Sequence, residues 1–375
     1  MKSQKRARVE KMSLRKKTKT RGTVKRSKFL RSTLARALIL SLLIVIGVSL
    51  VLFVIPKAYV AVRGEEITRQ VLSQFETGAD NTNQMAMGIY RWEQDNFLSP
   101  YSINLEDLTF FEQVLAGWGF YENKDGEIHL FRPGFGHYSV PPQWVLHSKL
   151  ANCKEYAEVF VYLLNQAGFR ARVVRAPGED HTWAEYYVGG YKIIFDPSNS
   201  VNPVIVNPKG FGKKRHFSYV EAYDLNNPNL REDVSDEYIE RGILVVKVVK
   251  DNRPVSSATV EVLSTYLIER YPERYKKPRP VISNKTHKDG LVQFKLGPNN
   301  YTLIAKKCSL LVCWKGETSG NVSVGATTHV LIELHIDYLN TGLRFASVLG
   351  VLGAVLVKFR KRYWDKPLSE SGDSR

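Results

Sequence analysis

The stretch ANCKEYAEVFVYLLNQAGFRARVVRAPGEDHTWAEYYVGGYKIIFDPSN, residues 151–199, decides how the middle of this chain folds. It contains Cys153, one of three cysteines in 375 residues, followed by His181 and Asp196. These residue types are those of a cysteine nucleophile, its base and the acid that orients the base. The alternative is an ordinary buried thiol beside unrelated polar residues, and the predicted local structure bears on that choice.

The first part of the stretch predicts a helix that begins at the cysteine. Apolar residues recur at helical steps of three and four after Cys153, at Ala157, Phe160, Val161, Leu164 and Ala167. Asn152 is a suitable N-cap and Gly168 a suitable stop. Cys153 then lies in the first turn, where the helix dipole and unpaired N–H groups favour a thiolate and its own N–H is placed to bind an oxyanion.

The second part predicts a strand over residues 169–176 and then a hairpin. The hairpin turns at residues 189–190, a Gly-Gly pair suited to a two-residue turn. In that register His181 faces Ser198, and Asp196, two residues from Ser198, lies on the same face as His181. Diagonal neighbours are about 7–8 Å apart at the backbone, within reach of long side chains. The imidazole and the carboxylate are therefore expected to touch, unless a three-residue turn reverses the parity.

With these residues in place, the stretch resembles the transglutaminase-like superfamily. That family's core has a cysteine at a helix start, then His-x-Trp, then Asp-Pro, and this chain has NCKEYAEVF, HTW and DPS in that order. The resemblance covers residues 80–240 and implies a papain-like α+β domain that attacks an amide. It gives the triad roles to Cys153 as nucleophile, His181 as base and Asp196 as orienting acid. The competing reading is a core cysteine that faces Phe160 and a histidine that caps a loop.

Flanking residues extend this resemblance. AMGIYRWEQDNFLSPY, residues 86–101, is similar to the helix that commonly precedes the core, and REDVSDEY, residues 231–238, to a short element in peptide N-glycanase relatives. Ala151 departs mildly from the family, which often has glycine two positions before the nucleophile. Trp118 and Trp144 are candidates for the second oxyanion donor, with a core aromatic as the alternative for each.

Two helices are expected before the core. Residues 81–101 carry apolar side chains at helical positions, namely Met85, Met87, Ile89 and Trp92. Residues 104–120 repeat apolar residues at helical spacing, with Asn104 as the cap candidate and glycine at the end.

The basic charge of the chain lies in its two ends. Residues 1–36 carry +14 and residues 358–375 carry +3, which accounts for the whole formal charge of +17. The folded middle therefore has no net charge that would favour binding to nucleic acid, and none is expected.

The positions of these charges fit a membrane anchor. ALILSLLIVIGVSLVLFVI, residues 37–55, is apolar throughout and long enough to cross a bilayer, so a transmembrane helix is predicted over residues 37–56. The basic tail of residues 1–36 is expected to stay cytoplasmic. A cleaved signal peptide fits less well because the basic region is too long, and a core helix less well because the segment is apolar on every side.

A second span is predicted over residues 339–359, around FASVLGVLGAVLV. Arg344 lies inside it, where an arginine can reach the membrane surface from near a helix end. KFRKRYW follows, so the tail of residues 360–375 is also expected to be cytoplasmic. The alternative is a membrane-surface or core helix. This topology places residues 60–338 outside the cell membrane, with both termini inside.

Residues 242–336 alternate in polarity between frequent turn signals, which predicts an all-β domain. KDNRPVSSATVEV and THKDGLVQFKLGPNNYTLIAKK resemble the carboxypeptidase regulatory-like, prealbumin-type β-sandwich, a structural or adhesive module. Outside the cell, Cys308 and Cys313 are expected to form a disulfide, with two buried unbonded cysteines as the alternative. The domain contains three glycosylation sequons, which begin at Asn284, Asn300 and Asn321.

The predicted architecture is thus an α+β papain-like, transglutaminase-like domain over residues 74–240, the β-sandwich and the two membrane helices. No zinc or calcium ligand set stands out, so neither a metal nor a cofactor is expected. The leading functional hypothesis is a membrane-anchored cysteine hydrolase that cleaves an amide of a protein or peptide substrate through a thioester. The alternatives are a transamidase that uses the same triad and a non-catalytic binding module. The sequence gives no oligomeric state.

Overall fold

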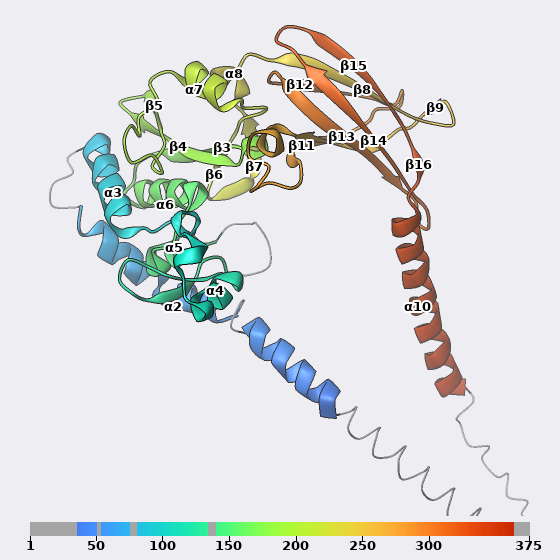
Figure 1. Ribbon diagram of the computed structural model, residues 1–375, viewed down its shortest axis with the longest axis horizontal. Coiled ribbons are helices and arrows are strands. Elements are labelled where there is room, and N and C mark those ends of the chain that lie inside the picture. Colours follow the sequence, from blue (N-terminus) through green and yellow to red (C-terminus); the bar gives the residue numbers. More distant parts are fainter. Residues whose placement is uncertain (1–35, 51–53, 76–80, 134–139, 364–375) are drawn as a thin grey trace, which may run out of the picture. The chain divides into compact units, whose positions relative to one another are not determined.

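The computed structural model describes residues 36–50, 54–75, 81–133 and 140–363 (Figure 1). The predicted basic tail of residues 1–36 and the tail of residues 360–375 fall almost entirely outside these ranges. The described chain forms two compact units, and the residues around Cys153, His181 and Asp196 belong to the second.

The first unit contains the chain up to residue 74 together with residues 97–151. Its elements are the helix Arg36–Ser49, α2 (Ile55–Leu72), η2 (Pro100–Ser102), η3 (Leu105–Asp107), α4 (Phe110–Gly117), β1 (Phe120–Glu122), β2 (Ile128–Leu130) and α5 (Pro142–Ser148). Helix α2 packs against α5, and β1 and β2 form a small antiparallel ladder.

The helix predicted after Asn104 begins later than expected. Asn104 caps only the short turn η3, by accepting a hydrogen bond from the Glu106 N–H. Thr109 caps α4 instead, because its side chain and that of Glu112 bond each other's backbone N–H groups in a capping box. The reciprocal pair satisfies two helix-start donors, whereas Asn104 has no such partner three residues on that continues the helix.

Two described helices are apolar and exposed. Tyr338–Leu356, within α10 (Tyr338–Tyr363), is long and apolar enough to cross a membrane, and no part of it is buried. The helix Arg36–Ser49 is shorter than a span, and the next residues of the predicted segment 37–56, residues 51–53, lie outside the described ranges. The N-terminal span is therefore left as a prediction.

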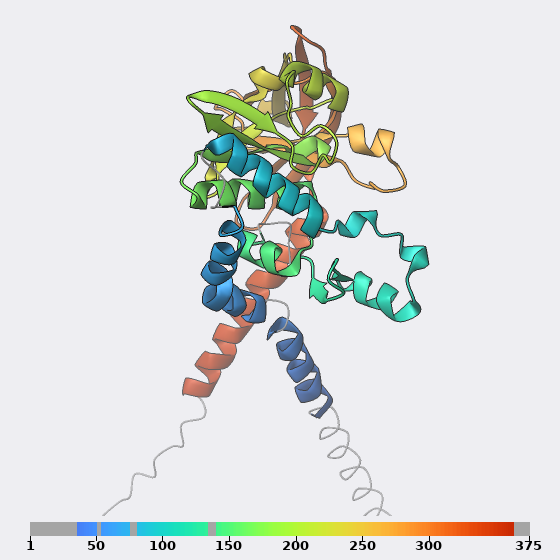
Figure 2. The ribbon, with the colours of Figure 1, turned by 90° about the vertical axis from the view of Figure 1, so that its left-hand side faces the viewer.

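The second unit contains residues 75–96 and the chain from residue 152. Its α+β part consists of α3 (Thr82–Asn96), α6 (Cys153–Gln166), β3 (Ala171–Ala176), η4 (Pro177–Glu179), β4 (His181–Val188), β5 (Tyr191–Phe195), α7 (Pro208–Arg215), β6 (Glu221–Asp224), β7 (Asn227–Asp233) and α8 (Ser235–Tyr238). The five strands form one sheet in the order β5-β4-β3-β6-β7. Helix α6 packs on β3 and β4, and α3 lies along α6 (Figures 1 and 2).

Strand β4 is the centre of this part because both of its faces are buried. The ring of Phe160 on α6 stacks on Phe195 at 4.8 Å between ring centroids, on the helix side of the sheet. Trp183 stacks on Phe217 at 5.1 Å on the opposite side. Burial on both sides explains why the sequence HTWAEY does not alternate between apolar and polar residues.

The predicted hairpin register is confirmed. Strand β4 pairs with β5 from Ala184 opposite Phe195 to Val188 opposite Tyr191. The two turn residues are Gly189 and Gly190, with φ of +55° and +88°. Positive φ at both positions is the requirement of the type I′ turn, which glycine meets without strain.

The β-sandwich comprises β8 (Gly242–Lys250), β9 (Arg253–Pro254), β10 (Thr259–Ser264), α9 (Tyr266–Arg270), β11 (Arg279–Lys285), β12 (Leu291–Leu296), β13 (Asn299–Cys308), β14 (Cys313–Val322), β15 (Thr327–Glu333) and β16 (His335–Ile336). One sheet has the order β11-β10-β13-β14-β16 and the second the order β12-β8-β15. Buried side chains from both sheets form one core, including Leu244, Phe294, Val262 and Leu303. A disulfide joins Cys308 to Cys313, which face each other across the β13–β14 turn.

Glu93 is an unusual buried group on α3. Its side chain is fully buried, and neither carboxyl oxygen has a hydrogen-bond partner among the described residues. Burial raises the pKa of Glu93 well above its ordinary value, because a charge is poorly solvated in the protein interior. The group is therefore protonated in the folded protein at a pH at which the unfolded chain has already lost the proton.

We predict that Glu93→Met stabilises the protein, with a gain in Tm of about 3–6 °C at pH 8, since an unsatisfied polar group is removed from the interior. A folded-state pKa above the unfolded value means that the wild type loses stability as the pH rises above the unfolded value. The gain should therefore be smaller at pH 5, as measured by thermal unfolding. Glu273→Met, at an exposed position, is the control, and a Glu93→Met variant that is less stable than the wild type at pH 8 would contradict the prediction.

Candidate active site

Cys153 is the first residue of α6, as predicted. Asn152 caps the helix by accepting a hydrogen bond from the Lys154 N–H, and Glu155 completes a capping box. The Cys153 side chain is partly exposed, and its thiol donates to the carbonyl oxygen of Asp180 at 3.8 Å. The N–H of Thr182 points to the same sulfur. The thiol therefore lies against the backbone on both sides of His181.

His181 and Asp196 are in direct contact. The Nε2 atom of His181 lies 2.9 Å from Oδ2 of Asp196, and both side chains are buried. Ser198 donates to Oδ1 of the same carboxylate from its hydroxyl at 2.7 Å and its N–H at 3.2 Å. Burial alone would raise the pKa of Asp196, but the hydrogen bonds from His181 and Ser198 and the charge of Arg215 outweigh it and lower the pKa. Asp196 is thus held as a carboxylate.

Several residues that support Asp196 were missed from the sequence. Arg215 at the end of α7 places Nη2 3.9 Å from Oδ2 of Asp196. Helix α3 holds the loop after Asp196, because Gln94 donates to the carbonyl of Pro197 at 2.7 Å and Tyr90 to that of Asn199 at 3.0 Å. Only the Ser198 contact had a local signal, since aspartate commonly bonds the backbone two residues on.

Aromatic rings form a wall around His181. Trp183 and Phe217 stack near the imidazole, with centroids 5.7 and 6.5 Å away, and Phe211 lies at 5.9 Å. The Trp183 indole N–H donates to the hydroxyl of Tyr238 at 3.1 Å, which fixes the central ring of the wall. The wall limits the positions that the imidazole can take.

The charges around the thiol do not favour a thiolate, contrary to the prediction from the helix start. Burial raises the pKa of Cys153 to about 12, and the negative charges of Asp180, Asp196 and Glu155 add to this effect. The helix dipole acts over one turn and is outweighed by the loss of solvation and by these carboxylates. Ionisation of the thiol therefore requires a base in contact with it.

The two tryptophans considered as oxyanion donors are placed differently. The Trp144 indole N–H donates to the carbonyl of Leu130 at 2.9 Å, so this donor is already used within the first unit. Trp118 is 63% exposed. Neither placement supplies a second donor, whereas the Cys153 N–H at the start of α6 stays the first candidate.

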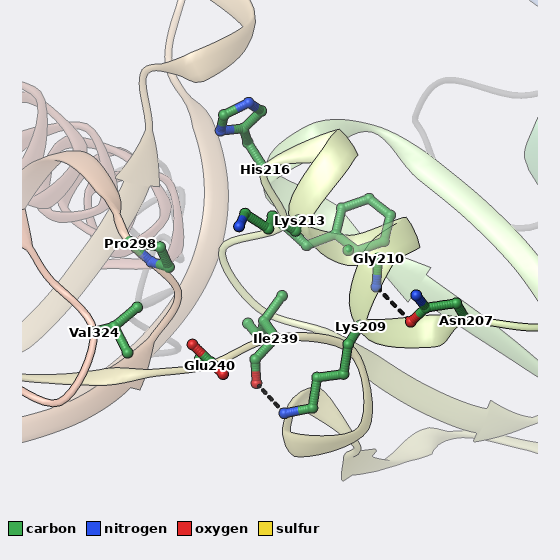
Figure 3. Close-up of a pocket in the computed structure, with 11 residues that line it drawn as sticks. Asn207, Lys209, Gly210, Lys213, His216, Ile239, Glu240, Pro298 and Val324 are labelled. Carbon is green, nitrogen blue, oxygen red and sulfur yellow. Dashed lines mark hydrogen bonds between the residues drawn. The ribbon is translucent and has the colours of Figure 1, made fainter.

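The largest described cavity is separate from these residues. It has a volume of about 430 Å³ and lies beside α7 (Figure 3). Lys209 donates to the carbonyl of Ile239 at 3.2 Å on one of its walls. Its lining contains neither Cys153 nor His181 nor Asp196, but Asn207, Lys209, Gly210, Gly212, Lys213, His216, Phe217, Ile239, Glu240, Pro298 and Val324. Among the described residues, no group of His, Cys, Asp or Glu is arranged to hold a metal ion.

Comparison with known proteins gives one family. The model of the transglutaminase-like superfamily matches residues 121–197, a range that contains Cys153, His181 and Asp196. The chain is thus similar to that superfamily over its central segment, and a cysteine hydrolase or a transamidase is the kind of enzyme this similarity suggests. No match was found among the curated proteins.

Three solved structures share part of the fold. They are the shaft pilin SpaA of Lactobacillus rhamnosus GG (8% identity, TM-score 0.22, 25% of this chain and 49% of the pilin), the minor pilin GBS52 of Streptococcus agalactiae (13%, 0.21, 41% and 68%) and the TIE protein of Bacillus anthracis (10%, 0.20, 32% and 24%). This chain therefore spans about half of the length of the shaft pilin.

The residue two positions before His181 is a second buried acid. Glu179 accepts hydrogen bonds from the Ser218 N–H at 3.0 Å, the Ser218 hydroxyl at 2.6 Å and the Ser264 hydroxyl at 3.0 Å. Burial raises the pKa of Glu179 to about 7, and the three hydrogen bonds only partly offset that rise. Ser264 belongs to the β-sandwich, so Glu179 joins that domain to the segment before His181.

We predict that Glu179→Gln removes part of the pH dependence of stability. The unfolded carboxyl loses its proton near pH 4.5 and the folded one near pH 7, so the wild type becomes less stable over that interval by about 3 kcal/mol. Denaturant unfolding of wild type and variant at pH 4.5, 6 and 7.5 measures the difference between them. The variant should gain on the wild type as the pH rises, and a constant difference across the three pH values would show that Glu179 titrates normally.

Proposed function

We propose that the chain is a membrane-anchored cysteine hydrolase that cleaves an amide bond of a protein or peptide through a thioester intermediate. Cys153 is the nucleophile, His181 the base and Asp196 the acid that orients it. The observation that carries the proposal is the buried His181–Asp196 hydrogen bond, next to a thiol that lies against the backbone on both sides of His181. The family match over residues 121–197 supports it.

The hydrogen bond to Asp196 assigns a role to each ring nitrogen of His181. Since Nε2 is bonded to the carboxylate, it carries a proton, and Nδ1 is the nitrogen left to accept the thiol proton of Cys153. Asp196, whose pKa is lowered, then stabilises the imidazolium. An ion pair formed in this way offsets the burial that otherwise keeps the thiol protonated.

The reaction then follows in two halves. The Cys153 sulfur bonds to the amide carbon, the carbonyl electrons move to the oxygen, and the Cys153 N–H donates to the oxyanion. The carbon–nitrogen bond breaks as Nδ1 of His181 gives its proton to the leaving amine, which produces the thioester. Nδ1 next takes a proton from water, whose oxygen attacks the thioester, and the proton returns to sulfur as the acid leaves. A primary amine in place of water makes the same site a transamidase.

We further propose that two membrane helices anchor the protein and that the domains between them lie outside the cell. The exposed apolar surface of α10 and of the helix Arg36–Ser49 supports this, because such surface is costly in water. The basic residues that flank both helices favour cytoplasmic termini. The Cys308–Cys313 disulfide fits an oxidising compartment.

The enzyme proposal predicts the pH dependence of alkylation at Cys153 by iodoacetamide. An unperturbed thiol ionises near pH 8.5, and a buried one higher, whereas a Cys153–His181 ion pair keeps labelling well below that pH. His181→Ala should abolish labelling at low pH, and Asp196→Asn should weaken it. A wild type that never labels, or labels like His181→Ala, would remove the basis for catalysis and leave a binding module.

The fate of the thioester is read from a peptide mixture by mass spectrometry, with and without a primary amine. Hydrolysis predicts new free carboxylates under both conditions, and transamidation predicts amine adducts. Cys153→Ser should lose at least about 100-fold in rate in either case. Equal product formation by wild type and Cys153→Ser would exclude Cys153 as the nucleophile.

The topology is tested with a membrane-impermeant maleimide on intact cells, in a Cys153→Ala background. Tyr191→Cys at the exposed β4–β5 turn should be labelled directly, since Tyr191 is 79% exposed. Ser13→Cys in the basic tail should be labelled only after permeabilisation. The reverse pattern would show that the domains face the cytoplasm.

A further inference from the structure

The β-sandwich contacts three consecutive residues immediately before His181. Gly178 approaches it so closely that a Cβ atom there would lie 2.8 Å from Val281 Cγ2 and 3.1 Å from Ser264 Cβ. Glu179 bonds Ser264, as described above. The carboxylate of Asp180 pairs with Arg279, with Oδ2 2.5 Å from Nη2. Val281, Ser264 and Arg279 all belong to the β-sandwich.

Asp180 connects these contacts to the thiol. Its carbonyl oxygen accepts from the Cys153 thiol at 3.8 Å, while its carboxylate bonds Arg279 and, at 3.4 Å, the hydroxyl of Tyr275. Asp180 has a φ of +53°, a conformation that a residue with a side chain adopts only at a cost. The guanidinium of Arg279 lies 5.6 Å from the centroid of the Tyr275 ring, so the cation is itself held in place. The contacts on both sides of Asp180 keep it in this conformation.

We propose that the β-sandwich completes the active site, and that Arg279 is a positioning residue that neutralises the Asp180 carboxylate beside the Cys153 thiol. The proposal rests on the proposed function and adds a partner domain to its site. A separate structural module would need none of these contacts with the residues that precede the base.

The charges around Cys153 explain why this neutralisation matters. The ionisable groups near the sulfur come from every element around it and are Glu155 on α6, Asp180 and His181 at the start of β4, Asp196 after β5, and Arg279 and Tyr275 from the β-sandwich. Three of them are carboxylates that oppose a thiolate. Asp196 is paired with His181 and Arg215, so Asp180 is the carboxylate whose charge depends on the β-sandwich.

The test measures the midpoint of Cys153 alkylation against pH in the full-length protein. Arg279→Gln should raise the midpoint by ~0.5 pH unit, a modest shift because the pair is partly exposed to water. Arg279→Lys keeps the charge and should stay close to the wild type. Asp180→Asn should lower the midpoint, and adding Arg279→Gln to Asp180→Asn should change nothing further. Lys277→Gln, at an exposed position on the same segment, is the matched control, and thermal unfolding confirms that each variant is folded.

Two results would overturn the inference. One is an unchanged midpoint in Arg279→Gln, which would mean that the contact only holds the domains together. The other is an equal shift from Arg279→Gln with and without Asp180→Asn, which would mean that Arg279 does not act through Asp180. These outcomes are independent of the proposed function, because a midpoint is measured whether or not the enzyme turns over. Failure of the proposed function is recognised instead by a wild type that labels like His181→Ala.

Discussion

The hydrogen bond between His181 and Asp196 depends on a turn of two residues. Gly189 and Gly190 both have positive φ, and only this short turn puts the imidazole and the carboxylate on the same face of the hairpin. One additional residue would move Asp196 to the opposite face of β5, away from the base. The site therefore relies on a backbone constraint about seven residues away from either side chain, which tertiary packing then reinforces through Ser198 and α3.

The local parts of this architecture could be predicted from the sequence, because short-range rules determine them. The start of α6 at Cys153, its Asn152 cap and the β4–β5 register all depend on residues within a few positions of one another. The start of α4 was wrong because two cap candidates compete, and only Thr109 has a partner for a capping box. The type of fold followed from the same local patterns together with the resemblance.

The electrostatics of the site could not be predicted in this way. The pKa of the Cys153 thiol depends on burial and on Asp180 and Asp196, which approach it from distant parts of the chain. Arg215 and Arg279 are likewise brought to the carboxylates by tertiary structure, and nothing near them in sequence marks the contact. A pattern reading locates a helix start correctly but contains no information on how much water remains around it.

The connection between the β-sandwich and α10 has a mechanical consequence. Strand β16 ends at Ile336 and α10 begins at Tyr338, and Thr341 in the first turn of α10 accepts a hydrogen bond from the Cys313 N–H at 3.0 Å. Arg344 one turn later donates to the carbonyl of Ser309, inside the disulfide-closed β13–β14 turn, at 2.9 Å. The helix is thus clamped to a crosslinked hairpin instead of hanging from a flexible tether. The sandwich moves with the helix as one lever, so a tilt of α10 would swing the whole domain, and the distance that the domain reaches is set by its own rigid length.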